Sequence, residues 1–123
     1  MGAITHTHAL ELWRTATVQA VRSDEPDLTT RQLAVLMTIT LGAPPHTVRG
    51  LAAALRIAKP AVTRAIDALE RHGLAVRVAD EDDARSVLVV RTARGQTFLA
   101  TLAAAIMQRA ADLAAPAPLV KSN

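Results

Sequence analysis

The chain has 123 residues, half of them hydrophobic, and a formal net charge of +3, so we expect one domain with a substantial core. It contains no cysteine, which excludes disulfides, thiol redox chemistry and zinc sites built on cysteine. No apolar run reaches the ~18 residues of a membrane span, and the N-terminus lacks the basic leader of a secretory signal. These absences predict a cytoplasmic protein.

The first half of the chain predicts three helices. Apolar residues recur at helical spacing over 6–22. The sequence Thr-Thr-Arg-Gln at 29–32 is typical of a capping box, which predicts a helix over about 30–41. Thr47 is placed to cap a short helix over about 48–55.

The second half predicts a helix, a hairpin and a final helix. A helix begins near Lys59 and Pro60 and ends at Gly73, a good left-handed stop. Two valine-rich runs, 74–79 and 86–91, bracket an acidic loop and predict a β-hairpin. Thr92 caps a last helix over 93–114, which Pro116 and Pro118 end, and the tail PAPLVKSN is expected to fray.

Positive charge is concentrated in one segment. Residues 47–77 contain six basic and two acidic residues, a net charge of +4, whereas residues 1–46 carry −1. A local excess of positive charge is typical of a surface that binds a polyanion.

The paired helices 48–55 and 59–72 predict a contact with a DNA major groove. The tight link at 56–58 joins them as in a helix-turn-helix, whose second helix meets base edges and phosphates with its N-terminal residues. We expect Arg64 to bond guanine, Thr63 a phosphate or base, Ala61 a thymine methyl and Lys59 a phosphate. These four residues are expected to face away from the buried stripe of Val62, Ile66 and Leu69. The alternative is that they form the solvated face of an amphipathic helix.

The hairpin predicts a second contact, because Arg85 lies close to its tip. Asp83 stands two residues before Arg85, near enough to pair with it and fix its direction. Arg85 would then enter a minor groove, where narrow tracts attract arginine. The alternative is a solvated acidic turn, since Asp80, Glu81, Asp82 and Asp83 are four carboxylates in a row.

Three stretches together resemble the multiple-antibiotic-resistance-regulator (MarR) family of bacterial transcription factors. TVRGLAAALRI resembles the first helix of the family's DNA-binding pair, and KPAVTRAIDALERHGLAVR its recognition helix and first wing strand. DEDDARSVLVVRTARG resembles its wing, with the D-x-R signature at Asp83-Ala84-Arg85 and the T-x-x-G turn at Thr92 and Gly95.

The resemblance implies a mostly α winged helix-turn-helix with a small β-hairpin wing. The whole of 1–123 would be a single MarR-like domain, with a DNA-binding core at about 28–91 and the helices 6–22 and 93–114 for packing or dimerisation. The implied DNA contacts are Thr63, Arg64 and Arg85; Asp83 would orient Arg85, and Arg77 matches a usual strand arginine, so we count Arg77 among the expected DNA contacts. The family also implies a homodimer on a pseudo-palindromic double-stranded operator, repression, and a small aromatic or phenolic effector.

The chain departs from the family pattern in three places. Gly50 stands where a glutamate often completes the cap, Ala84 replaces a frequent second wing arginine, and Arg91 replaces a usual leucine. Two other functions therefore stay open: a winged-helix module for protein–protein contact, and a constitutive DNA-binding protein without a ligand.

Neither an enzyme nor a metalloprotein is expected. His6 and His8 are two residues apart and do not share a helix face, so a metal site is not predicted. No serine, histidine and carboxylate form a catalytic pattern, and no phosphate-binding glycine loop or cofactor motif is present.

Overall fold

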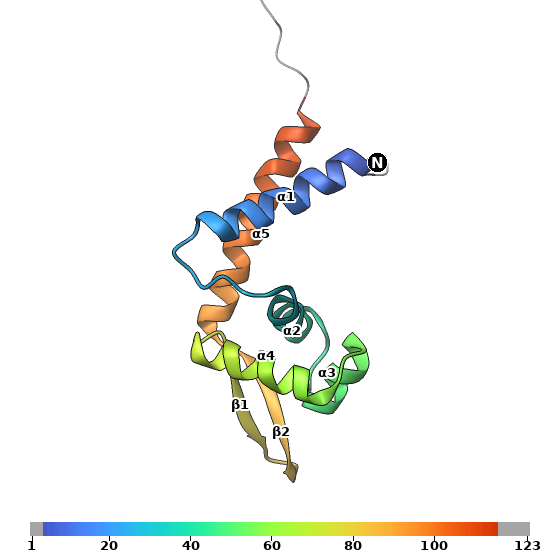
Figure 1. The fold of residues 1–123 in the computed structure, drawn as a ribbon, viewed down its shortest axis with the longest axis vertical. Helices are drawn as coiled ribbons and strands as arrows, with labels where there is room; N and C mark the ends of the chain where they lie inside the picture. Colours follow the sequence, from blue (N-terminus) through green and yellow to red (C-terminus); the bar gives the residue numbers. More distant parts are fainter. Residues whose placement is uncertain (1–3, 116–123) are drawn as a thin grey trace, which may run out of the picture. The chain divides into compact units, whose positions relative to one another are not determined.

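The computed structural model describes residues 4–115 and arranges them as five helices and one hairpin (Figure 1). The helices and the hairpin fall close to where the sequence predicts them, and the fold class, a mostly α winged helix-turn-helix, is confirmed. Pro116, Pro118 and the predicted fraying of the tail lie outside the described residues. The elements are α1 His6–Arg22, α2 Thr30–Leu41, α3 Val48–Leu55, α4 Lys59–Arg71, β1 Ala75–Asp80, β2 Asp83–Arg91 and α5 Ala93–Ala114.

The described residues divide into two compact units. Residues 25–100 form the winged-helix unit, which holds α2, α3, α4, the hairpin and the first part of α5. α1 and the second part of α5, from residue 101, form the other unit. The prediction of a single domain over 1–123 stays a prediction.

The core of the winged-helix unit is aliphatic. In Figure 1 its three helices α2, α3 and α4 lie together, and the hairpin extends from them. Side chains with almost no exposed surface come from α2, α3, α4 and β2 and from the residue just before β1, so the unit is held mainly by burial of apolar area. They are Val35, Leu36, Leu51, Val62, Ile66, Leu69, Leu74 and Val89.

Local hydrogen bonds set the ends of the helices. At the start of α2, Thr29 Oγ1 accepts from the amide of Gln32 (3.1 Å) and Gln32 Oε1 accepts from the amide of Thr29 (3.0 Å), which confirms the predicted capping box. At the end of α4, Gly73 adopts a left-handed φ of 74°, and the amide of Leu74 donates to Leu69 O (2.8 Å). This 6→1 bond is the Schellman motif, which turns the chain from α4 into β1.

The hairpin begins its second strand earlier than the sequence predicts. The antiparallel register runs from Ala75 opposite Arg91 to Asp80 opposite Asp83, with an irregularity between Ala79 and Asp80. The prediction that the second strand starts at Ser86 was therefore wrong, because one more pair, Asp80 with Asp83, forms beyond the irregularity, despite the low strand propensity of aspartate. The segment before α3 joins the sheet through one further bond, from the amide of Val89 to His46 O (2.9 Å).

A threonine and a glycine join the hairpin to α5. Thr92 Oγ1 donates to Gly73 O (2.7 Å) and accepts from the amide of Gly95 (3.0 Å). A Cβ added at Gly95 would lie 2.2 Å from Leu74 O, so only glycine allows this approach. Thr92 and Gly95 of the T-x-x-G pattern therefore have a structural role: they hold the end of the wing against the start of α5.

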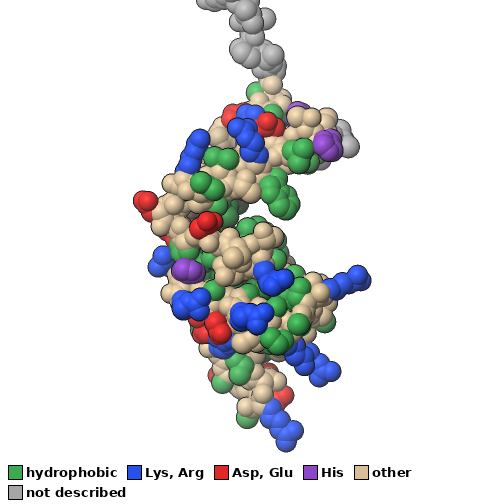
Figure 2. All heavy atoms as spheres, viewed as in Figure 1, with side chains coloured by type: hydrophobic (Ala, Val, Ile, Leu, Met, Phe, Trp, Pro, Cys, Tyr) green, Lys and Arg blue, Asp and Glu red, His purple; other side chains and the backbone are tan. Residues whose placement is uncertain are grey.

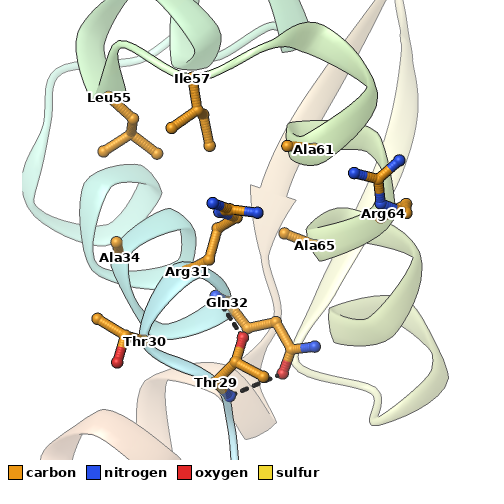
Figure 3. Close-up of a pocket in the computed structure, with 10 residues that line it drawn as sticks. All are labelled: Thr29, Thr30, Arg31, Gln32, Ala34, Leu55, Ile57, Ala61, Arg64 and Ala65. Atoms are coloured by element: carbon orange, nitrogen blue, oxygen red, sulfur yellow. Dashed lines mark hydrogen bonds between the residues drawn. The ribbon is translucent and has the colours of Figure 1, made fainter.

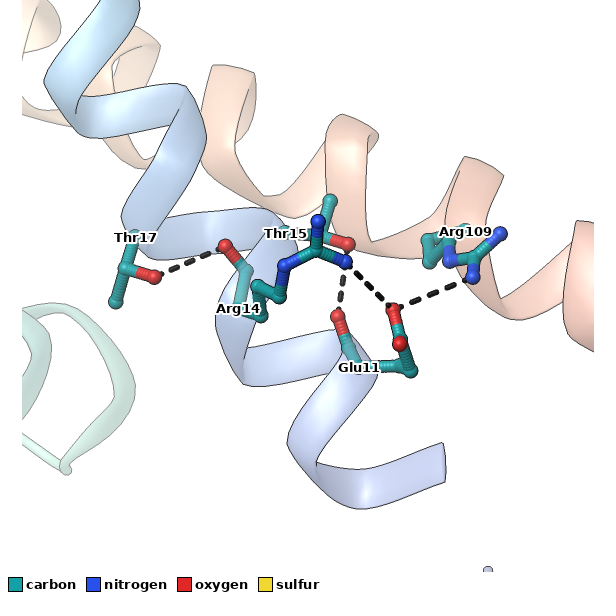
Figure 4. Close-up of polar contacts among 5 residues, drawn as sticks. All are labelled: Glu11, Arg14, Thr15, Thr17 and Arg109. Carbon is teal, nitrogen blue, oxygen red and sulfur yellow. Dashed lines mark hydrogen bonds and ion pairs between the residues drawn. The ribbon is translucent and has the colours of Figure 1, made fainter. Parts of the chain in front are cut away.

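In the second unit, a carboxylate links α1 to α5 (Figure 4). Glu11 Oε2 on α1 accepts from Arg14 (3.3 Å) and from Arg109 on α5 (3.2 Å). Large apolar side chains of this unit are nevertheless exposed, among them Leu10, Trp13, Val21 and Met107. The unit therefore retains apolar surface that its own two helices do not cover.

Candidate nucleic-acid interface

The turn between α3 and α4 places the N-terminus of α4 at the surface. α3 is capped by Thr47 Oγ1, which accepts from the amide of Gly50 (3.0 Å). It ends at Arg56, a non-glycine residue in the left-handed region with φ 56°. α4 starts with Lys59 and Pro60 in its first turn, and no side chain caps it. Pro60 has no N–H, and the amides of Ala61 (3.0 Å) and Val62 (3.2 Å) donate to Ala58 O, so this first turn offers an outside partner mainly the positive end of the helix dipole.

One side of α4 is buried and the other is charged. Val62, Ile66 and Leu69 face the core as predicted, whereas Lys59 and Arg64 are exposed. Thr63 is half-buried. The helix therefore presents Lys59, Thr63 and Arg64 together near its N-terminus, on the side predicted from the sequence.

Ala61 does not belong to that side. Its exposed fraction is 7%, and the prediction that it faces away from the core was wrong. The reason is the helical angle: Ala61 precedes Ala65 by four residues and Ala68 by seven, and all three pack inward. A thymine-methyl contact from Ala61 is incompatible with this burial.

Arg77 is held by two carboxylates of α4. Its guanidinium bonds Asp67 Oδ1 (2.7 Å) and Glu70 Oε1, and its backbone amide donates to Glu70 Oε2 (3.2 Å). A weaker bond of 3.5 Å reaches Thr63 O. Partial burial works to lower the pKa of Arg77, but its bonds to Asp67 and Glu70 outweigh this and hold the pKa above its ordinary value.

Asp67 and Glu70 compete with DNA for the Arg77 charge, and the DNA contact predicted for Arg77 stays a prediction. Arg77 connects β1 to α4, and its one positive charge offsets one of the two negative charges of Asp67 and Glu70 on that helix face. The sequence reasoning missed the roles of Asp67 and Glu70. Their signal was their spacing: residues 63, 67 and 70 share one face of a helix, and a strand arginine follows the turn.

Asp83 in the wing orients Arg85 by a hydrogen bond to the Arg85 backbone amide. Asp83 Oδ1 accepts from the amide of Arg85 (3.0 Å) and Asp83 Oδ2 accepts from the Ser86 hydroxyl (3.0 Å). No ion pair joins Asp83 to the Arg85 guanidinium in the part of the chain that the structure describes. The predicted side-chain pairing was therefore wrong, because both carboxylate oxygens are occupied by local turn bonds.

Exposed basic side chains are spread over several elements of the winged-helix unit. Figure 2 shows Lys and Arg side chains at separate points of this unit, one of them at the tip of the hairpin. The acidic residues of the tip oppose them: Asp80 Oδ1 is bonded to the amide of Asp82 (2.9 Å), but the carboxylates stay exposed or nearly so. The positive surface therefore lies on the helices and at one arginine of the wing. Its basic members are Arg31, Arg49, Arg56, Lys59, Arg64, Arg71 and Arg85.

Within residues 4–115, no group of three or more histidine, aspartate or glutamate side chains is close enough to hold a metal ion. None of the helices in that range has the length and apolar character needed to cross a bilayer.

Comparison with known proteins identifies the winged-helix segment. The sequence model of the MarR family matches residues 27–86. None of the curated protein sequences matches the chain.

Solved structures share the fold at low sequence identity. RV1404 from Mycobacterium tuberculosis superposes with a TM-score of 0.75 and 21% identity, over 87% of this chain and 71% of that one. The S. aureus MepR–DNA complex gives a TM-score of 0.71 and 20% identity, over 87% and 76%. CouR from Rhodococcus jostii RHA1, bound to p-coumaroyl-CoA, gives 0.64 and 23%, over 88% and 75%. At these identities the likeness establishes the fold.

Proposed function

The winged helix of this chain, residues 27–86, belongs to the MarR family, and on this basis we propose that the protein is a transcriptional regulator that binds double-stranded DNA sequence-specifically. The observation that carries the proposal is the exposed cluster of Lys59, Thr63 and Arg64 at the uncapped start of α4. A major groove accepts a helix end of this kind, and Arg64 bonds guanine while Thr63 and Lys59 hold phosphates or a base.

The braced wing supplies the second contact. Arg85 makes no ion pair among the described residues, and the Asp83 turn fixes its backbone at the tip. It enters a minor groove beside the site that α4 reads. Arg77 keeps the wing and α4 in one geometry and is a positioning residue.

A homodimer is part of the proposal. Trp13 is 71% exposed, and the apolar surface around it on α1 continues with Leu10 and Val21, which lie on the same side of the helix. Large apolar side chains exposed on one side of a helix are typical of an interface. Two copies place two α4 helices about one helical turn, ~34–36 Å, apart on a pseudo-palindromic operator.

Repression and release by a small effector complete the proposal. Family membership supports both, and the S. aureus MepR–DNA complex and CouR bound to p-coumaroyl-CoA support a DNA ligand and an organic ligand for this fold. Binding over a promoter represses by excluding the polymerase.

A second candidate, a protein-contact module, draws on the acidic tip. Asp80, Glu81, Asp82 and Asp83 are a poor match for a phosphate backbone, and a basic partner surface fits them better. A salt titration separates the two functions, because each phosphate contact contributes about 0.9 to the slope of log K against log salt.

The test uses a duplex from upstream of the gene and an unrelated duplex. We expect a steep loss of affinity with salt, and for Arg64→Ala a loss of about 1–3 kcal/mol on the upstream duplex with an unchanged Tm. The control is Arg14→Ala, which removes an exposed charge from α1. A flat salt dependence with both duplexes supports the protein-contact module, and equal losses on both duplexes reduce Arg64 to a phosphate contact.

A further inference from the structure

The turn between α3 and α4 contains an arginine whose backbone conformation is unfavourable for a residue with a side chain. Arg56 has φ 56° and ψ 45°, and among residues 4–115 it is the only non-glycine residue with a positive φ. In this left-handed region a Cβ lies too close to the following carbonyl oxygen, whereas glycine adopts it freely. Glycine is also the usual residue at a left-handed helix end. Folding alone therefore favours glycine at position 56.

Hydrogen bonds and apolar packing hold the α3–α4 turn in this conformation. The amides of Arg56 and Ile57 both donate to Ala52 O, the second over 3.2 Å. In Figure 3 the side chains of Leu55 and Ile57, on either side of Arg56, point into a pocket between α2 and α4. A right-handed or extended backbone at Arg56 would break these contacts, so the strain is retained in the folded chain.

The Arg56 side chain makes no bond that offsets the strain. It is exposed, and it forms no hydrogen bond or ion pair with another of the residues that the structure describes. Strained backbone conformations that the surrounding fold enforces are concentrated at functional sites. The combination of a strained backbone and an unpaired charge indicates that Arg56 contacts a partner outside the chain.

The surroundings of Arg56 indicate that this partner is a polyanion. Residues 28–66 contain five basic residues and no acidic one. Lys59 is exposed at the start of α4, three residues after Arg56, and three residues of chain span at most about 10–11 Å. In a helix-turn-helix the first helix crosses the DNA backbone while the second lies in the major groove. The end of α3 is therefore expected beside the phosphates that flank the groove.

We propose that Arg56 bonds a DNA phosphate next to the one that Lys59 holds, and that arginine is kept in a glycine-type conformation for this contact. The contact rests on the proposed function and adds a residue to its interface. A guanidinium can bond two phosphate oxygens at once. Because the turn fixes the Arg56 backbone relative to α4, the contact sets the register of α4 on the duplex, and it does not read bases.

Three substitutions separate the Arg56 charge from the backbone strain. Arg56→Lys keeps a positive charge and a Cβ, Arg56→Ala keeps only the Cβ, and Arg56→Gly removes both. Binding to the upstream and the unrelated duplex is measured over a series of salt concentrations, and the Tm is measured without DNA. Arg14→Ala on α1 is the control for loss of an exposed charge elsewhere.

We expect Arg56→Ala and Arg56→Gly to bind both duplexes about tenfold more weakly, the effect of a lost bond to a charged group. Their slope of log K against log salt should be smaller by about one. Arg56→Lys should bind within about threefold of the original chain. The Tm should rise by about 3–5 °C in Arg56→Gly and stay within about 1 °C in the other two, since only glycine removes the Cβ. Arg56→Gly is then the more stable protein and the weaker DNA binder.

The results that refute the Arg56 contact differ from those that refute the proposed function. If Arg56→Ala binds both duplexes as tightly as the original chain, Arg56 contacts no phosphate and the proposed function stands. A loss confined to the upstream duplex also refutes the phosphate contact, because phosphates carry no sequence information. A Tm for Arg56→Gly no higher than that of Arg56→Ala refutes the claim that arginine is kept against folding. An original chain that binds neither duplex refutes the proposed function, and the Arg56 contact with it.

Discussion

Replacing Arg77 by methionine tests whether this arginine braces the wing or contacts DNA. Methionine keeps most of the aliphatic stem and removes the charge. The bonds lost are those to Asp67 (2.7 Å) and Glu70, while the backbone bond from Arg77 to Glu70 remains. The change therefore isolates the guanidinium.

The expected loss in free energy of unfolding follows from how far Arg77 and its two partners are buried. The Arg77 side chain is 27% exposed and its partners 49% and 35%, so each pair lies between a fully exposed and a buried one. About 1 kcal/mol for each pair gives a loss of roughly 2 kcal/mol in the free energy of unfolding. For a chain of this length the Tm should fall by about 6–10 °C.

A double-mutant cycle provides the assay. Urea unfolding is measured for Arg77→Met, for Asp67→Asn with Glu70→Gln, and for all three changes together. If Arg77 is a brace, Arg77→Met costs less than half as much free energy of unfolding once the two carboxylates are neutral. An equal cost in both backgrounds, or a cost under about 0.5 kcal/mol in the original chain, would refute the brace.

The pH dependence has a definite sign. The folded-state pKa of Arg77 is raised, so its contribution to stability is complete below the unfolded-state pKa and is lost only as pH rises through the folded value. An arginine therefore contributes undiminished from neutral pH through the workable alkaline range. Arg77→Met should lower stability by the same amount at neutral and mildly alkaline pH.

DNA binding completes the test of Arg77. A brace lowers affinity by disturbing the wing, and the slope of log K against log salt is unchanged. A phosphate contact lowers that slope by about one. A slope change of this size on Arg77→Met would restore the DNA contact predicted from the sequence.

Three further substitutions test local features. Gly95→Ala forces a Cβ to 2.2 Å from Leu74 O and should lower the free energy of unfolding in urea by about 2–3 kcal/mol. The control Gly50→Ala should change it by less than about 1 kcal/mol. Similar effects for both variants would contradict the close approach at Gly95. Thr29→Ala removes the bond from the Gln32 amide to Thr29 Oγ1 but leaves the bond from the Thr29 amide to Gln32 Oε1, and it should lower the Tm by an amount equivalent to about 1 kcal/mol. Thr29→Ser should keep most of the stability, and equal losses for the two variants would show that the hydroxyl does not act as a cap. Asp83→Ala should release the turn and weaken DNA binding about fivefold at nearly constant Tm. Asp83→Asn keeps an acceptor oxygen and should weaken DNA binding less. Stronger DNA binding by both variants would show instead that the Asp83 charge repels DNA.

The sequence was sufficient to predict the helices and the winged helix-turn-helix fold. Helical periodicity, the Thr29 cap and the Gly73 stop are local signals, and local signals act over a few residues of chain. The same reasoning located the exposed charges of α4, since a stripe of Val62, Ile66 and Leu69 fixes which side points outward.

Only the tertiary structure decided what each charged residue contacts. Arg77 lies ten residues beyond Asp67 and reaches it because the Schellman turn folds β1 back along α4. The Val89 amide likewise bonds His46 O (2.9 Å), which lies 43 positions earlier in the sequence. A sequence pattern specifies the direction of a side chain from its own element, whereas the partner it meets depends on how distant elements pack, and that information is not contained in local spacing.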